Sequence, residues 1–257
     1  MRLSRAALVA PAALAAVVVI LPMAALVVGT SWAELPERLT DPAVRPALRL
    51  SAVTTLATVV LCWAFGTPLA WLLSRADGRA ARWLRALLTV PIVLPPVVGG
   101  VALLLAYGRR GLVGAPLFEA LGLRIPFTPV AVVLAQVFVS LPFYVLAVEG
   151  SMRGIDRRLL DLSATLGARP LRIFTRVALP LAAPGLAAGT ALAWARALGE
   201  FGATITFAGN FEGRTQTTSL LVYVALQDDP QTAVALSIAM LVVAVAVLGA
   251  LRGRWLR

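Results

Sequence analysis

The sequence predicts an all-α integral membrane protein with about six membrane-spanning helices. The chain has 257 residues, of which 60% are hydrophobic, and its mean hydropathy is +0.89. Only 14% of the residues are charged, against roughly 25% in typical soluble domains. The charges stand in short stretches between long apolar runs, and roughly 20 apolar residues cross a bilayer as a helix. Helices are expected because lipid offers the backbone no hydrogen-bonding partners.

The apolar runs place six spans along the chain. The first is expected at residues 6–33, which carry no charge. This run is longer than the roughly 7–15 apolar residues of a secretory signal, and no clear cleavage site follows it. We therefore interpret it as an uncleaved anchor. The other spans are expected at residues 50–74, 86–108, 125–148, 180–208 and 230–251, and a charged loop at 149–179 separates the fourth from the fifth.

Proline and glycine interrupt two of these spans. The fourth contains Pro142, and the third contains a cluster of such residues. Interruptions are tolerated where neighbouring helices or water satisfy the freed backbone groups. They are interpreted either as kinks that improve packing or as the lining of a pathway. The cluster in the third span consists of Pro91, Pro95, Pro96, Gly99 and Gly100.

The arginines orient the bundle, because positively charged loops stay in the cytoplasm. All 23 basic residues are arginine. If the N-terminus is inside, 15 arginines fall on inner segments and 7 on outer segments, and Arg196 lies within a span. This bias predicts a multi-pass protein of the plasma membrane with both termini in the cytoplasm.

Composition excludes several kinds of chemistry. The chain has no histidine, which removes His-based catalysis and the usual zinc sites, so no catalytic or metal-binding residue is expected. Its only cysteine, Cys62, forms no internal disulfide. Without lysine there is no phosphate-binding GxxxxGK[ST] loop, so any ATP must be bound by another chain. The net charge of +11 does not indicate a nucleic-acid partner, because the arginines flank apolar spans and form no single basic face.

The loop after the fourth span has a helical pattern. Arg157, Arg158 and Asp161 fall outside its apolar positions. Gly167 follows them at a position that suits a left-handed helix end. The apolar residues recur at offsets of 4, 7 and 11, which predicts one stripe on a short helix. They are Ile155, Leu159, Leu162 and Leu166.

A second short helix is expected after the glycine turn. Pro170 suits its first turn, and Leu171, Phe174 and Val177 continue an apolar face at spacings of three. The pair of helices is expected to lie against the cytoplasmic membrane surface. One interpretation is an amphipathic helix that lies on lipid. The polar face carries both signs of charge, which favours a protein partner.

This loop resembles a motif of the permeases of ATP-binding-cassette (ABC) importers. Their pattern is EAA, three residues, Gly, nine residues, Ile, any residue and Leu-Pro. Here Asp161-Leu162-Ser163 takes the place of EAA and keeps only its acidic character, whereas Gly167 and the closing residues match in spacing. The closing residues of the motif are Val177, Leu179 and Pro180.

The resemblance implies a type I importer permease over residues 50–251, with a coupling helix that docks into a groove on an ATPase subunit. The residues that it places at this contact are Ile155, Arg157, Arg158, Asp161, Leu162, Ser163, Gly167 and Leu171. It further implies a homodimer with one pathway, two ATPase subunits that hold ATP and Mg²⁺, and an extracytoplasmic oxyanion-binding protein. No cofactor is expected on this chain.

A later segment indicates the substrate. The run from Gly199 to Thr204 reads GEFGAT, AGN ends at Asn210, and GRTQT follows at residues 213–217. These runs resemble permeases for molybdate, with tungstate and sulfate permeases as near relatives. The resemblance therefore implies import of molybdate or a closely related oxyanion.

Two ionisable residues lie inside the fifth span. Arg196 and Glu200 are four residues apart, so they can pair on one helix face. They are interpreted either as a self-neutralising pair that locks the helix to its neighbours or as part of a pathway. Gly202 allows close helix approach. Thr204 and Asn210 offer neutral donors to a passing anion.

Two other classes of protein are possible but fit the sequence less well. An ion-driven secondary transporter predicts inverted repeats and carboxylates near the membrane midplane. Glu200 is the one midspan carboxylate in the sequence, and no inverted repeat is visible. A membrane protein with a structural or assembly role is also disfavoured, because it gives no reason for the motif spacing in the loop.

Overall fold

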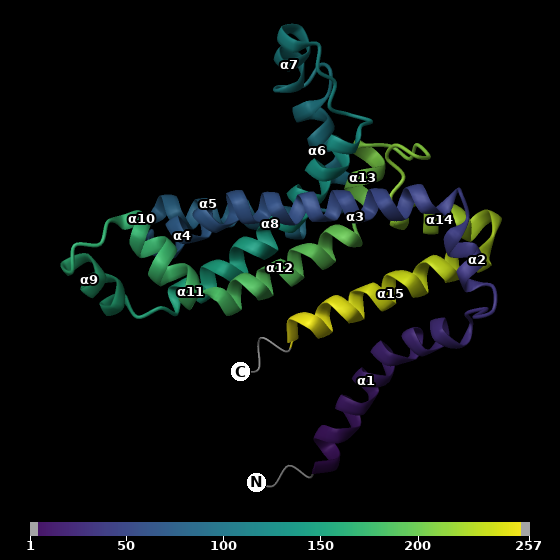
Figure 1. Ribbon diagram of the computed structural model, residues 1–257, viewed down its shortest axis with the longest axis horizontal. Coiled ribbons are helices and arrows are strands. Elements are labelled where there is room, and N and C mark those ends of the chain that lie inside the picture. The colour runs from purple at the N-terminus through teal and green to yellow at the C-terminus, as the bar shows by residue number, and fades with distance from the viewer. Residues whose placement is uncertain (1–4, 253–257) are drawn as a thin grey trace.

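The protein is an elongated bundle of helices. The computed structural model describes residues 5–252. Most of its long helices run side by side, and a short arm leaves the bundle at a steep angle (Figure 1). Within the described residues, four helices are long and apolar enough to cross a membrane, or up to six if each of two bent pairs counts as one span. This confirms the predicted fold class.

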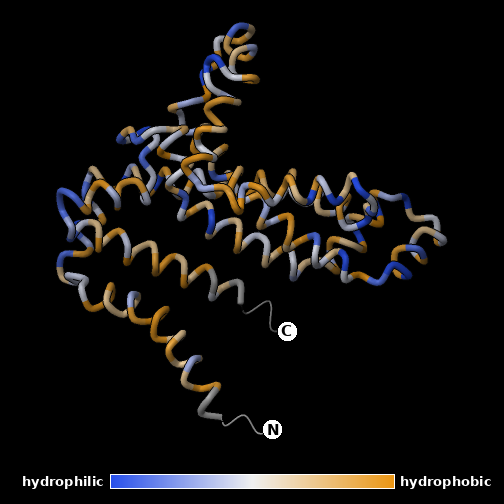
Figure 2. Tube along the Cα trace, turned by 180° about the vertical axis from the view of Figure 1, so that it is seen from behind, coloured by the Kyte–Doolittle hydropathy of each residue, from blue (hydrophilic) through white to orange (hydrophobic). Residues whose placement is uncertain are grey.

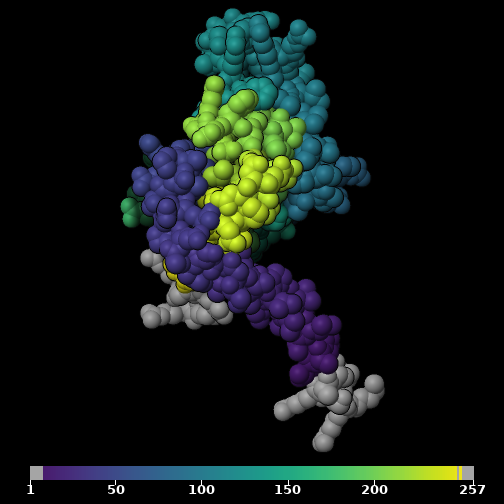
Figure 3. Space-filling view, turned by 90° about the vertical axis from the view of Figure 1, so that its right-hand side faces the viewer, coloured from purple at the N-terminus to yellow at the C-terminus, as the bar shows by residue number. Residues whose placement is uncertain are grey.

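The first span stands apart from the bundle. Helix α1 (Arg5–Val28) is followed by the short helix α2 (Leu35–Thr40). Figure 3 shows α1 extending away from the other helices, on the opposite side from the arm. The helix ends before residue 33, the expected limit, because Gly29 interrupts it and the Thr30 hydroxyl donates to the carbonyl of Leu26 at 2.7 Å.

The second span is longer than the expected residues 50–74. It consists of α3 (Val44–Leu61), a π-helical turn η1 (Cys62–Gly66) and α4 (Thr67–Arg75). The early start adds Arg45 and Arg49 to the helix. Arginines at a helix end can extend their charged heads to the membrane surface, so they need not end the span.

The third span is bent where one continuous helix was expected at residues 86–108. Helix α5 (Arg79–Val93) and helix α6 (Pro96–Tyr107) meet at an angle of 118°. Helical geometry is disfavoured for the residue before a proline, and Leu94 and Pro95 are both extended here, with ψ of 130° and 132°. Helix α6 and helix α7 (Gly114–Leu121) form the arm that leaves the bundle.

The fourth span is the central helix of the bundle. Helix α8 runs from Pro129 to Arg153, whereas the expected span was residues 125–148. It begins late because the Thr128 hydroxyl accepts the N–H of Ala131 as an N-terminal cap. It continues into the expected loop because Glu149 is buried and ion-paired.

The fifth span is broken twice. After α9 (Arg157–Thr165), the chain passes through α10 (Pro170–Ile173), the π-helical turn η2 (Phe174–Ala178) and α11 (Leu179–Leu181). Helix α12 follows at Ala183–Leu198 and helix α13 at Gly202–Phe207, so residues 180–208 are not one helix. Gly199, Glu200 and Phe201 separate α12 from α13.

Two helices complete the chain. Helix α14 (Thr218–Asp228) precedes α15 (Pro230–Arg252), which is the sixth span and differs by one residue from the expected residues 230–251. At the end of the bundle opposite α9, Arg38 contacts both Glu34 at 2.9 Å and Asp229 at 2.7 Å. Hydrogen bonds from Thr232 and the nearby charge of Arg38 lower the pKa of Asp229.

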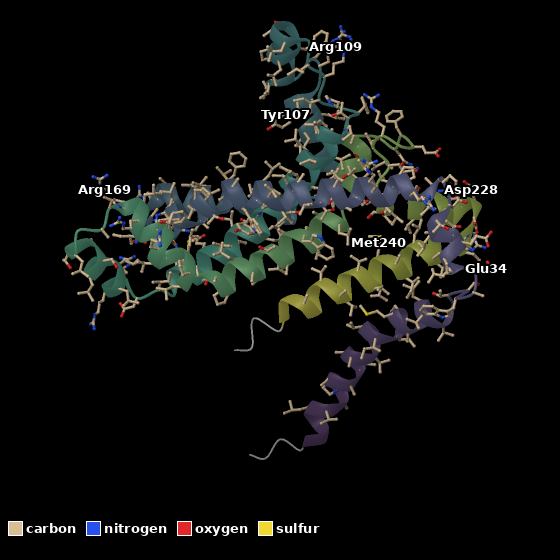
Figure 4. All side chains as sticks on the ribbon, in the orientation of Figure 1. Glu34, Tyr107, Arg109, Arg169, Asp228 and Met240 are labelled. Carbon is tan, nitrogen blue, oxygen red and sulfur yellow. The ribbon has the colours of Figure 1, made fainter. Side chains whose placement is uncertain are left out.

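Polar residues gather at the two ends of the bundle (Figure 2). Figure 4 shows Arg169 at one end, Glu34 and Asp228 at the other, and Met240 between them. This distribution is the one expected of a protein whose middle lies in lipid. Arg2, Arg254 and Arg257, on which the predicted orientation partly depends, lie outside the described residues.

Small residues let α8 and α12 pack closely. Gly189 lies against Tyr144, which is fully buried, and Gly185 lies against Ser151. A Cβ atom at position 185 would overlap the Ser151 side chain. Small residues at such contacts are common where helices associate inside a membrane. The position of α12, and of the segment that follows it, therefore depends on these glycines.

We expect Gly185→Ala to destabilise the protein by about 1–3 kcal/mol, because the added methyl has no free space at the α8–α12 contact. Thermal unfolding in detergent checks this. Gly150→Ala is the matched control, since Gly150 is on α8 and a Cβ there meets nothing within 4 Å. An equal melting temperature for the two variants would contradict the close packing.

Candidate functional site

The predicted loop forms two short helices at one end of the bundle. Helix α9 begins with a cap in which the Asp156 carboxylate accepts the N–H of Arg158 at 2.9 Å. Gly167 follows with a left-handed φ of +80°, a conformation that glycine adopts without strain. Pro170 opens α10. The glycine turn and the second helix start are therefore at the expected residues.

Three of the four residues of the predicted apolar stripe face away from the bundle, whereas Ile155 is half-buried and packs against the clusters that contain Met152 and Leu160. Leu162 is 59% exposed and Leu166 is 88% exposed. Leu159 is also exposed, whereas Leu160 is buried against Ile173 and Ala178. Leu160 thus packs α9 against the rest of the bundle, a contact that the apolar spacing did not predict. Periodicity could not predict that Leu160 is buried, because Leu160 lies next to the apolar stripe and outside its spacing.

Charged residues accompany the exposed stripe. Arg157, Arg158 and Asp161 are exposed, and Ser163 is half-buried with its hydroxyl donating to the carbonyl of Leu159 at 2.7 Å. Leu171, beyond the turn, is also exposed. The loop therefore presents a surface that is partly apolar and partly charged. Such a surface suits a protein partner, because mixed charges surround apolar positions that water solvates poorly.

A tryptophan connects the loop to the second span. Trp71 of α4 packs against Phe174 with ring centroids 5.2 Å apart, and the Arg75 guanidinium lies 3.7 Å from the centroid of its ring. Trp71 also contacts the hydrophobic clusters that contain Val148 and Leu160. It therefore lies between the loop and the interior of the bundle. Nothing in the linear sequence brings residue 71 close to residue 174.

The end of the loop motif lies in irregular helix. In η2 the N–H of Leu179 donates to the carbonyl of Phe174, five residues earlier. Pro180 has no N–H, so it cannot continue the ordinary pattern. Val177 and Leu179 are half-buried and Pro180 is exposed. The motif end therefore forms the entry into α12.

Arg196 and Glu200 are paired, as their spacing suggested. Arg196 Nη1 lies 2.8 Å from Glu200 Oε2, close enough for an ion pair, although the alignment is not that of a hydrogen bond. The Glu200 side chain is 1% exposed, and that of Arg196 is 30% exposed. Glu200 Oε1 also accepts the N–H of Ala203 at 2.8 Å. One carboxylate therefore holds both the end of α12 and the start of α13.

Helix α13 packs tightly on α6. A Cβ atom on Gly202 would lie 2.7 Å from Pro96, and one on Gly100 would lie 2.6 Å from Thr206. The bend in the third span and the break in the fifth therefore meet. Within the described residues, Thr204 and Asn210 have buried oxygen atoms without a hydrogen-bond partner. The structure places the candidate pathway residues on one segment and brings only Arg196 and Glu200 into contact.

A polytopic bundle with an exposed helical loop at one end and a broken polar segment within it is typical of a membrane permease. Residues 65–256 match the family described as binding-protein-dependent transport system inner membrane component, and the chain belongs to this family. The match confirms the resemblance that the loop motif indicated.

Several proteins that are similar to this chain are described as parts of transport systems. The chain is 48% identical over 234 residues to the molybdenum transport system permease protein ModB of Mycobacterium tuberculosis, covering 91% of this chain and 88% of the relative. It is 39% identical to the ModB protein of Escherichia coli K12, covering 85% and 95%. Among solved structures, a bacterial ABC transporter involved in import of the acidic polysaccharide alginate has a chain with a TM-score of 0.77. That alignment is 14% identical and covers 97% of this chain and 93% of the other, so it shows a shared fold.

We expect Glu200→Ala to destabilise the protein by about 1–3 kcal/mol, because it leaves Arg196 without its counter-charge and the N–H of Ala203 without its acceptor. Glu200→Gln retains a neutral acceptor for this N–H, so we expect this variant to lose less stability than Glu200→Ala. Thermal unfolding of the two variants measures the difference. A stability loss in Glu200→Gln as large as in Glu200→Ala would show that the charge pair matters more than the cap.

Proposed function

We propose that this chain forms the membrane pathway of an ATP-driven importer for molybdate or a closely related oxyanion. The similarity to molybdenum transport permeases over nearly the whole chain carries the proposal. Sulfate and tungstate are likewise tetrahedral dianions, and they are the alternative substrates. The chain is a permease subunit, so its own residues carry out no bond-making chemistry.

The exposed face of α9 supports a contact with an ATPase subunit. Leu159, Leu162 and Leu166 offer an apolar stripe that a folded partner would cover. Arg157, Arg158 and Asp161 surround it and supply charge complementarity. The partner ATPase holds ATP and Mg²⁺, and this end of the bundle lies in the cytoplasm. Both chain termini are cytoplasmic in this arrangement.

A second copy of the chain completes the pathway in this proposal. The two copies are related by a two-fold axis, with two ATPase subunits below and an oxyanion-binding protein above. ATP binding closes the ATPases, draws the two coupling helices together and opens the pathway outward. Hydrolysis then returns it to the inward-facing state. In this proposal the binding protein supplies most of the selectivity.

Arg196 has the features of a residue that attracts the anion. Its side chain is partly exposed although it lies within the bundle, and Glu200 fixes its position. The pair is net neutral, so Arg196 offers a local positive field without trapping a dianion. Thr204 and Asn210 would add neutral hydrogen bonds along the same segment. Transient binding of this kind suits a pathway, since conduction requires that the substrate leave.

Transport by the purified complex tests the function. With the ATPase and the binding protein present, vesicles containing this chain should accumulate molybdate only when ATP is supplied.

In the same vesicles, we expect Arg196→Gln to lower the uptake rate by roughly tenfold, which corresponds to a loss of about 1.4 kcal/mol of transition-state stabilisation. Uptake without ATP would contradict the importer and favour an ion-driven transporter. Faster uptake of sulfate would change the assigned substrate.

A cysteine cross-link tests the ATPase contact. In a Cys62→Ser background, Leu162→Cys should cross-link to a cysteine introduced on the ATPase surface, because position 162 is exposed at the loop. Leu112→Cys is the matched control, as Leu112 is also well exposed but lies on the arm near α7. Equal cross-linking from both positions, or from neither, would argue against docking at α9.

A further inference from the structure

A buried carboxylate joins two helices, α8 and α5, at the loop end of the bundle. Glu149 of α8 has a side chain that is 6% exposed. Its Oε1 accepts a hydrogen bond from Arg85 Nε of α5 at 2.7 Å. Arg153 Nε lies 3.0 Å from the same oxygen. We call Glu149, Arg85 and Arg153 the clasp.

Arg85 extends the clasp to a third helix. Its Nη2 donates to the carbonyls of Leu73 and Ala76, the latter at 2.8 Å. These carbonyls stand at the C-terminal end of α4, where helical carbonyls lack partners within the helix. A guanidinium at this end also stabilises the helix dipole. One arginine therefore fixes the ends of α4 and α5 to α8.

The clasp lies directly at the base of the loop. Arg153 is the last residue of α8, and α9 begins at Arg157. Arg157 Nη2 lies 3.7 Å from Asp77 Oδ2, in the turn between α4 and α5. The loop base is therefore attached twice to the same turn, once through a buried pair and once through an exposed pair.

The other end of α5 leads to the candidate pathway. After the bend at Pro95, α6 carries Gly99 and Gly100, and Gly100 packs against Ala203 and Thr206 of α13. Glu149 is therefore connected, through Arg85 and α5 and then across the bend, to the contact between α6 and α13.

A buried ion pair is a poor means of stabilising a protein, because desolvation offsets most of its attraction. Such a pair does fix the relative positions of the groups that it joins. We propose that Glu149, through Arg85, is a positioning residue that transmits movement of the α9 loop to α5 and so to the α6–α13 contact. This inference rests on the proposed importer function and goes beyond it by assigning the connection within the chain.

The test compares ATP hydrolysis with anion uptake in vesicles that contain the full complex. In Glu149→Gln the attraction to Arg85 is weakened while the side chain keeps its size. We expect the number of ATP molecules hydrolysed per molybdate imported to rise roughly fivefold or more, the scale of a typical coupling between sites. Arg85→Lys keeps the charge but cannot reach the carboxylate and both carbonyls together, so we expect a smaller rise.

Arg38→Gln is the control, because it breaks an ion-pair cluster between helices at the opposite end of the bundle. Its ratio of ATP to molybdate should equal that of the wild type. A static structural role for the clasp would lower the melting temperature and the amount of assembled complex, and leave this ratio unchanged. Wild-type ratios in both Glu149→Gln and Arg85→Lys would overturn the proposal.

The two proposals fail in distinguishable ways. If the wild-type complex shows no ATP-dependent uptake of any tested oxyanion, the importer function fails. If the wild type imports molybdate with ATP and the clasp variants hydrolyse the same number of ATP molecules per molybdate, only the proposed role of Glu149 fails. If Glu149→Gln does not assemble, the Arg85→Lys ratio alone decides, since that variant keeps both charges.

Discussion

The demand that every backbone polar group find a partner inside the bundle governs this structure. Lipid supplies none, so a helix can break only where protein groups or water supply a substitute. At the break before α13, the Glu200 carboxylate accepts the free N–H of Ala203. At the end of α4, Arg85 donates to the carbonyls of Leu73 and Ala76. Both substitutes are ionised side chains held by a counter-charge, and both stand at candidate functional segments.

Helix α8 supports the segments in which side chains satisfy these backbone groups. It packs against the second, third and fifth spans, and its Tyr144 and Val148 lie in the main hydrophobic cluster. Gly185 and Gly189 of α12 bring the fifth span against it. Further along, Gln136 accepts a hydrogen bond from Thr58 at 3.0 Å, which ties α3 to the same helix. The loop at one end and the α6–α13 contact are therefore positioned on one common support.

The features of the fold that depend on local periodicity and hydropathy could be predicted from the sequence. The six apolar runs, the turn at Gly167 and the Arg196–Glu200 spacing all follow from local pattern. It did not predict the 118° bend or the break before α13, because proline and glycine mark an interruption without giving its angle. It also placed Glu149 in a loop. A carboxylate normally ends a span, and this one is buried because Arg85, 64 residues earlier in the chain, joins Arg153 in pairing with it.

The neutrality of the Arg196–Glu200 pair has an electrical consequence for the proposed importer. A dianion that enters a cell with a negative interior moves against the membrane voltage. This costs roughly 4.6 kcal/mol per 100 mV for two charges. Because Glu200 cancels Arg196 within the bundle, the pair adds no net charge along the path. A fixed charge could change only the energy profile within the pathway and not the total work between the two sides, so in the proposed importer ATP hydrolysis supplies the energy for accumulation.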